Sequence, residues 1–79
     1  MRTDLRSDVG LRLRQMREKL ELSQEALAER AGLHRNYVGS VERGERDIGL
    51  TALASLVRSL DSSLADFFEP FRSNARSKR

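Results

Sequence analysis

The strongest constraint on the fold is a pattern of small and aliphatic residues between residues 24 and 43. Along this stretch come a small residue, a glycine, an apolar residue and two valines, at Ala28, Gly32, Leu33, Val38 and Val41. Two helices that cross steeply need a small residue where they nearly touch and a glycine at the left-handed position of the turn. The aliphatic residues then hold the second helix against the first. The pattern predicts two short helices joined by a tight turn, with an ordinary helical hairpin as the weaker alternative.

Five helices are expected from the apolar periodicity and from the residues that flank each periodic stretch. They cover about residues 8–20, 24–31 and 35–43, a stretch from about Leu50, and a short one that opens at Ser62 or Ser63 and carries Leu64, Phe67 and Phe68. Ser23 and His34 are placed as N-caps of the second and third helices, and Gly49 as a weak cap of the fourth. Pro70 bars a simple continuation of the fifth helix. No stretch alternates as a strand would, so the fold class is expected to be all-α.

The length of 79 residues suits one domain with unstructured ends. Residues 1–8 are expected to form an N-terminal arm and residues 9–71 the domain. Residues 72–79 have no apolar periodicity and are expected to form a disordered basic tail. No apolar run approaches the roughly 20 residues that span a bilayer, and the first residues lack a signal-peptide core. The chain is therefore expected to be cytoplasmic, with no membrane partner.

Composition argues against metal sites and enzymatic chemistry. With no cysteine and one histidine, the chain has no disulfide framework and no evident metal site, and no cofactor is expected. A Gly-rich phosphate loop is absent and the acidic residues are spread over solvated faces, so an enzyme is not expected. Lys and Arg number 15 against 12 Asp and Glu, a net charge of +3 that mildly favours a nucleic-acid partner.

The residues around the predicted turn resemble a known family. The run Leu22–Leu33 (LSQEALAERAGL), followed by Tyr37-Val38 and by VERG at residues 41–44, resembles the lambda-repressor-like (Xre/Cro) family over about residues 9–68. Within that family, residues 34–38 and 42–48 are most similar to the controller proteins of restriction-modification systems, compact single-domain dimers that set the timing of endonuclease expression. The resemblance implies a compact five-helix DNA-binding domain and a sequence-specific transcriptional regulator of double-stranded DNA.

Two residues depart from the pattern of the controller proteins. Asp47 stands where asparagine is usual, and its charge is expected to weaken a phosphate contact by repulsion. Asp61 stands where a glycine is common after the fourth helix. Neither departure changes the predicted fold.

The resemblance also implies which residues contact DNA. Those expected to contact base edges from the outward face of the third helix are Arg35, Asn36 and Ser40. An arginine fork suits guanine and an asparagine amide suits adenine, whereas the alternative role is a solvated helix face. Those expected near phosphates are Ser23, Gln24, Tyr37, Arg43 and Arg46. Alternative roles stay open for these residues. Ser23 can act as an N-cap, Tyr37 can pack at the rim of the core, and the two arginines can serve only to keep the surface soluble.

Two pairings follow from the same resemblance and from the apolar C-terminal residues. Arg17 and Glu42 match an arginine and a glutamate that tie two helices together, so an ion pair is expected between them. A homodimer is expected through the fourth and fifth helices, since a domain this small cannot bury Leu64, Phe67, Phe68 and Phe71 together. The symmetric partner would place two third helices about 34 Å apart on an inverted-repeat operator. RNA polymerase is a further candidate partner.

A different function within the same family is the main alternative. An antitoxin or a phage-type repressor would act partly through protein-protein contacts of its apolar C-terminal helices. The basic, polar outer face of the third helix favours DNA over such a partner, because protein interfaces use aromatic and aliphatic anchors. Gly39 inside this helix is open to two interpretations, a close approach to DNA or tolerance at an exposed position.

Overall fold

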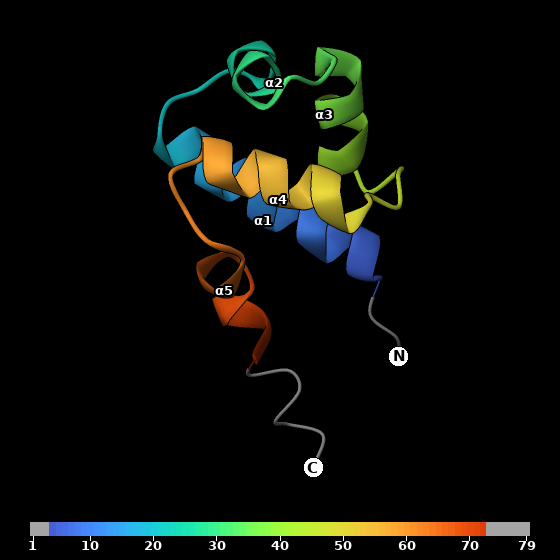
Figure 1. Cartoon of the computed structure of the whole chain (residues 1–79). Helices are drawn as coiled ribbons and strands as arrows, with labels where there is room; N and C mark the ends of the chain where they lie inside the picture. Colours follow the sequence, from blue (N-terminus) through green and yellow to red (C-terminus); the bar gives the residue numbers. More distant parts are fainter. Residues whose placement is uncertain (1–3, 73–79) are drawn as a thin grey trace.

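In the computed structural model, which describes residues 4–72, the chain folds into α-helices and one short 3₁₀ helix (Figure 1). The elements are α1 (Leu5–Lys19), α2 (Gln24–Ala31), α3 (Arg35–Glu42), α4 (Leu50–Ser59), α5 (Leu64–Phe67) and η1 (Glu69–Phe71). The described residues contain no strand, so the all-α prediction is confirmed. None of the described helices is both long and apolar enough to cross a membrane.

The core joins all five α-helices through side chains spaced three or four residues apart. Its buried members are Val9, Leu13, Leu27, Ala28, Val38, Val41, Leu53, Leu56, Val57, Leu60 and Phe67. Such spacing puts the apolar side chains of one helix on a single face. The third helix packs against both α1 and α2, and α2 packs against α4. Helix α3 is therefore held in place by α1 and α2. Helix α5 lies below the other helices in Figure 1.

A glycine brings α1 unusually close to α3. A Cβ atom added at Gly10 would lie 2.3 Å from the carbonyl oxygen of Val41 and 2.6 Å from that of Glu42. These are backbone atoms, which cannot move aside without shifting the helix. Only glycine permits this approach. Gly10 thus sets the position of the C-terminal end of α3 relative to α1.

The first helix begins earlier than the sequence predicts. Leu5 is its first residue, and the amide of Asp8 donates to the carbonyl oxygen of Asp4 at 3.1 Å. A Cβ atom added at Gly44 would lie 2.7 Å from Ser7 Oγ and 3.0 Å from Ser7 Cα, so this first turn packs against the chain after α3. The expected arm over residues 1–8 is therefore wrong for residues 5–8. Residues 1–3, and the predicted tail beyond Arg72, lie outside the described residues.

The chain leaves α1 and α4 through the same local geometry. Glu21 and Asp61 both have a φ of 60°, in the left-handed region that favours glycine. Two residues further on, Ser23 and Ser63 cap the next helices, accepting from the amides three residues ahead at 2.9 and 3.1 Å. The backbone after the fourth helix thus favours a glycine, and Asp61 adopts this conformation at an energetic cost.

The short helix α5 is fastened to α1 by an arginine. Arg12 donates from Nε to the carbonyl oxygen of Phe67 at 2.7 Å and from Nη2 to that of Asp66 at 2.8 Å. Its guanidinium also lies 5.9 Å from the Phe67 ring centroid. Phe67 is fully buried in the single chain, so its predicted place in a dimer interface is wrong. Because the ring fills the core between helices, it has no surface left for a partner, whereas Leu64, Phe68 and Phe71 are half-buried.

Candidate nucleic-acid interface

The predicted turn between α2 and α3 is present, with the caps in the expected places. Gly32 ends α2 with a φ of 71°, and the amide of Leu33 donates to the carbonyl oxygen of Ala28 at 2.8 Å. His34 caps α3 by accepting at Nδ1 from the amide of Asn36, 3.1 Å away. The two helices cross steeply in Figure 1. The turn thus fixes the direction in which the first residues of α3 leave the domain.

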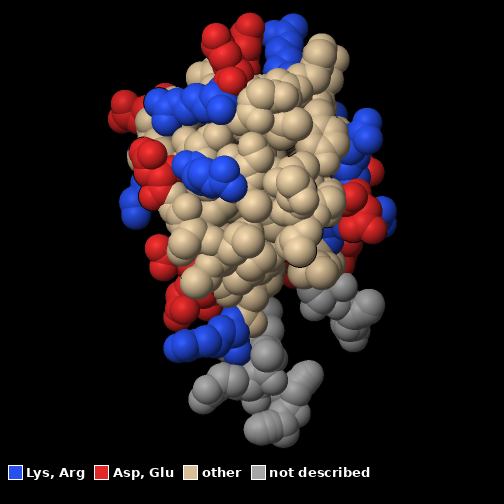
Figure 2. Space-filling view, viewed as in Figure 1, with Lys and Arg blue, Asp and Glu red and all other residues tan. Residues whose placement is uncertain are grey.

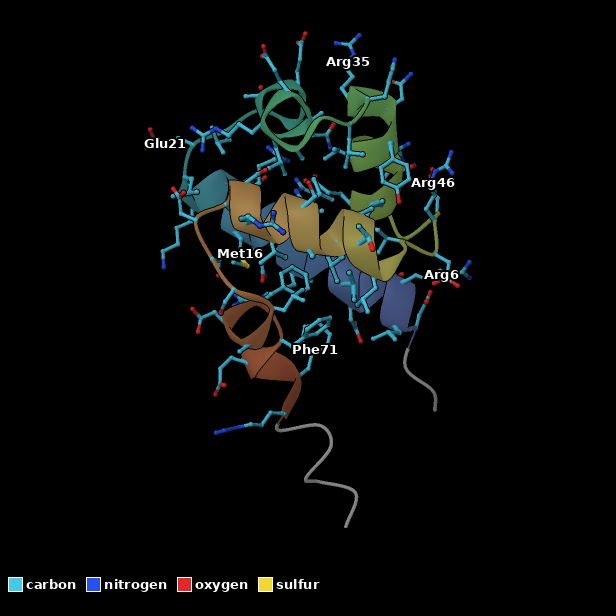
Figure 3. The ribbon with its side chains drawn as sticks, viewed as in Figure 1. Arg6, Met16, Glu21, Arg35, Arg46 and Phe71 are labelled. Carbon is cyan, nitrogen blue, oxygen red and sulfur yellow. The ribbon has the colours of Figure 1, made fainter. Side chains whose placement is uncertain are left out.

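The N-terminal end of α3 presents an arginine and an asparagine to solvent. Figure 3 shows Arg35 extending away from the end of the helix. Its Nη1 lies 3.7 Å from Oε1 of Glu25, and both side chains are more than three-fifths exposed, at 63% and 73%. An exposed pair at this distance contributes little and exchanges readily. Arg35 and its exposed neighbour Asn36 are therefore available to an external ligand.

A second group lies on the outer side of α3, where Tyr37 and Ser40 meet Arg46 from the segment that follows the helix. Ser40 donates from its hydroxyl to the carbonyl oxygen of Tyr37 at 2.8 Å and accepts from Arg46 Nε at 3.1 Å. The Arg46 guanidinium lies 5.1 Å from the Tyr37 ring centroid, a cation–π distance. Tyr37 is half-buried against the core, so its place at the core rim is confirmed. In this conformation Ser40 is left with a lone pair and no free proton, so it can only accept from a ligand.

A buried ion pair ties α1 to α3, as predicted. Arg17 Nε lies 2.7 Å from Glu42 Oε2 and Arg17 Nη2 lies 2.9 Å from Glu42 Oε1, with the two side chains 11% and 2% exposed. Arg17 also donates to the carbonyl oxygen of Leu22 at 2.7 Å, and Gln24 Nε2 donates to Glu42 Oε1 at 2.9 Å. The hydrogen bonds to Glu42 raise the pKa of Arg17 above its ordinary value. The pair and its two added hydrogen bonds join α1, α2 and α3 beneath the exposed face.

Gly39 is buried, and it makes room for two side chains of this face. A Cβ atom there would lie 3.2 Å from Gln24 Oε1 and 3.2 Å from Arg43 Nη1. Of the two interpretations that the sequence left open, tolerance at an exposed position is therefore wrong. Since the space over Gly39 is already taken by Gln24 and Arg43, the glycine acts through them and presents no open backbone to a ligand.

Arg43 is held by a glutamate two residues further on. Its Nε and Nη2 lie 2.9 and 3.1 Å from the two carboxylate oxygens of Glu45, a bidentate pair. Gly44 lies between them with a φ of 76°, which turns the chain so that the two side chains meet. The hydrogen bond raises the pKa of Arg43 and lowers that of Glu45. Glu45 was not among the site residues predicted from the sequence. An acidic residue directly after Arg43 and Gly44 could have indicated a partner for the arginine.

The structure sorts the eight predicted contact residues into two groups. Five of them line an open groove between α2 and α3, namely Ser23, Gln24, Arg35, Asn36 and Arg43, together with Arg17, Glu25 and Gly39. Tyr37, Ser40 and Arg46 form the second group. Figure 3 shows Arg46 projecting sideways, away from Arg35. The groove combines the first turn of α2 with exposed cationic and amide side chains of α3, which are the groups that bind phosphates and base edges.

A steep helix pair with an exposed, arginine-bearing second helix defines the helix-turn-helix class of DNA-binding domains. The family model described as Helix-turn-helix (HTH_3) matches residues 13–67, more than half of the chain. The chain belongs to this family of DNA-binding transcriptional regulators, and within it to the restriction-modification controller proteins.

Three known proteins show the similarity. The chain is 44% identical over 61 residues to the control protein C.SmaI of Serratia marcescens, covering 77% of this chain and 73% of that protein. It is 43% identical to the restriction-modification controller protein C.AhdI of Aeromonas hydrophila, with a TM-score of 0.78 over 80% of this chain and 96% of that one. The controller protein C.Esp1396I, solved as a tetramer with its natural 35 base-pair operator, is 28% identical with a TM-score of 0.83, over 91% and 95% of the two chains.

Proposed function

We propose that this protein binds an inverted-repeat operator in double-stranded DNA as a homodimer and so regulates the genes of a restriction-modification system in the cytoplasm. The observation that carries the proposal is the groove in which exposed Arg35 and Asn36 of α3 lie beside Ser23 and Gln24 of α2. C.Esp1396I, similar over most of this chain, was solved on its operator. A contact with RNA polymerase stays a prediction.

Base recognition is assigned to the first turn of α3 and to Ser40. Arg35 can place two parallel N–H groups on guanine O6 and N7, and Asn36 can pair with adenine N6 and N7. Ser40, whose proton is used by the Tyr37 carbonyl oxygen, would accept from an amino group of cytosine or adenine. Arg35 is the main discriminating residue in this assignment because it lies in the first turn of α3 and its exposed side chain extends away from the helix (Figure 3).

Phosphate binding is assigned to both sides of the base-contacting turn. Ser23 and Gln24 stand at the N-terminus of α2, where unpaired amides and the helix dipole favour an anion. Gln24 is held by Glu42, so its free oxygen and remaining N–H are fixed relative to α3. Arg43 and Arg46 lie after α3, with Arg46 steadied by Tyr37 and Ser40. These contacts would set the position of the domain on the duplex without discriminating sequence.

The homodimer is assigned to an apolar surface that includes three predicted residues and extends beyond them. Leu64, Phe68 and Phe71 remain half-buried, and the structure adds Leu5 and Leu50, which are 60% and 71% exposed. Leu5, Leu50 and Phe68 line one apolar recess. Figure 2 shows a wide uncharged area on the face that carries α4. A symmetric copy would cover this apolar surface and present two α3 helices about 34 Å apart.

Selection of bound fragments from random duplex DNA tests the proposal. Two inverted half-sites with centres about 10 base pairs apart are expected, one for each α3 of the dimer. Enrichment of a single asymmetric site, or no enrichment, would contradict it. Sedimentation supplies the matching test of assembly, because a monomer at micromolar concentration and above is incompatible with a stable dimer.

A further inference from the structure

The turn after α3 fixes a carboxylate against one of the DNA-facing arginines. The amide of Glu45 donates to the carbonyl oxygen of Ser40 at 2.9 Å, and that of Gly44 donates to Val41 at 3.0 Å. This is the hydrogen-bond pattern of a helix closed by a left-handed glycine. Glu45 is therefore fixed to the end of the helix, and its carboxylate has a defined place relative to Arg43.

Glu45 occupies one edge of the guanidinium and leaves the other edge free. The carboxylate takes Nε and Nη2 of Arg43. Nη1, with two N–H donors, lies on the opposite side, over Gly39 and towards Gln24, where the groove is. Both side chains are more than half exposed, at 59% and 56%, so DNA can reach the pair. The carboxylate thus orients Arg43 towards the groove and at the same time neutralises it.

These two effects act differently on different DNA. Binding to arbitrary sequences is almost entirely electrostatic, so a neutralised arginine adds little to it. On an operator, base contacts hold the domain in one register, and an Nη1 edge that is already oriented can then meet a phosphate without reordering the side chain. A carboxylate in this position should weaken non-specific binding more than operator binding.

We propose that Glu45 is a specificity-determining residue, which suppresses binding to non-operator DNA by neutralising and orienting Arg43. The proposal rests on the proposed function, since it assumes that the groove binds DNA. Glu25 does not serve in the same way, because it lies 3.7 Å from Arg35 and makes no bidentate contact.

The test compares the full chain with Glu45→Gln on an operator duplex and on a scrambled duplex at several salt concentrations. Glutamine keeps the size of the side chain and one acceptor for Arg43 but removes the charge. Affinity for the scrambled duplex is expected to rise about three- to tenfold with a salt slope steeper by about one unit. Operator affinity should rise less, so the ratio of the two affinities falls.

Two further variants separate the charge from its position. Glu18→Gln is the matched control, because Glu18 forms an equally exposed pair with Arg14 at 3.0 Å on α1, and it should leave the affinity ratio unchanged. Glu45→Asp keeps the charge and should stay close to the wild type on the scrambled duplex. A rise there as large as that of Glu45→Gln would overturn the argument from charge.

The outcomes distinguish this inference from the proposed function. An unchanged affinity ratio in Glu45→Gln, or the same fall in Glu18→Gln, overturns the role of Glu45 while operator binding stands. A wild-type protein that binds operator and scrambled duplexes equally overturns the proposed function itself.

Discussion

Two consecutive residues at the end of α3 form bidentate ion pairs with opposite consequences. Glu42 pairs with Arg17 at 2.7 and 2.9 Å where the side chains are 2% and 11% exposed. Arg43 pairs with Glu45 at 2.9 and 3.1 Å where both are more than half exposed. The geometry is nearly the same, so burial decides the role. The buried pair holds three helices together, whereas the exposed pair is accessible to an external ligand.

The buried pair is tolerated in the core because its polar atoms have hydrogen-bond partners. The Glu42 carboxylate accepts from two Arg17 groups and from Gln24, and among the described residues no buried side-chain nitrogen or oxygen lacks a partner. A buried charge without such partners is strongly destabilising. The framework below the groove between α2 and α3 therefore depends on all three side chains.

Removing one member of the buried pair should give the largest effect. Glu42→Ala leaves the Arg17 charge without its partner inside the domain, and the free energy of unfolding should fall by about 3 to 5 kcal/mol. Urea denaturation followed by circular dichroism measures the change. Glu45→Ala is the matched control, and its unfolding midpoint should stay close to that of the wild type because the exposed pair is screened by water. Equal losses in the two variants would contradict the comparison.

Loss of the discriminating arginine should be next in size. Arg35→Ala should cost about 1 to 3 kcal/mol of operator binding per half-site and flatten the preference at one base position. Arg46→Ala should instead weaken operator and scrambled duplexes alike and lower the salt slope by roughly one unit, because Arg46 contacts Ser40 and Tyr37 and has no carboxylate partner among the described residues. Binding curves on both duplexes over a salt series separate the two kinds of loss. An Arg35→Ala protein with its full operator preference would show that another residue discriminates bases.

The contact of α1 with α3 offers a way to disturb the buried pair without touching a charge. Gly10→Ala places a methyl group against the carbonyl oxygens of Val41 and Glu42, and the unfolding free energy should fall by about 1 to 3 kcal/mol. Gly49→Ala is the control, since nothing lies within 4 Å of the added carbon, and only a small capping loss is expected. Thermal melting that ranks the two variants in the reverse order would contradict this contact.

The smallest expected effect is a gain at an exposed junction. Asp61→Gly removes left-handed strain of about 1 to 2 kcal/mol and adds an entropic cost of about 0.5 to 1 kcal/mol, so stability should rise by about 1 kcal/mol or less. A melting temperature higher by a few degrees is expected. Gly32→Ala provides the converse test, because its φ of 71° puts the new methyl group under strain. A fall in stability with Asp61→Gly would show that the aspartate makes a compensating interaction.

Local signals predicted the elements, whereas long-range contacts could be predicted only through the family resemblance or not at all. The caps at Ser23 and His34 and the glycine at 32 act within a few residues, so α2 and α3 lie where their sequence predicts. The Arg17–Glu42 pair spans 25 residues and was predicted only through the family resemblance. Whether Phe67 faces the core or a partner depends on where α5 docks.

The sequence also could not predict the contacts that individual site residues make with residues far along the chain. No periodic pattern marks Gly10 as a contact with the α3 backbone, because the contact joins residues more than thirty positions apart. Ser40 was correctly placed on α3, but its bonds to Tyr37 and Arg46 depend on the turn that brings Arg46 back. Residue type and spacing thus identified the exposed face of α3. The structure was needed to show which donors and acceptors on that face are free.

The most direct test of the central claim is a crystal structure of the protein bound to its selected operator duplex. The account predicts α3 in the major groove, with the Arg35 guanidinium within hydrogen-bond distance of a guanine O6 and N7. Arg17 should remain paired with Glu42, as in the free protein. A complex in which α3 faces solvent, or in which Arg35 stays beside Glu25 and contacts no base, would contradict the assignment of α3 as the base-contacting helix.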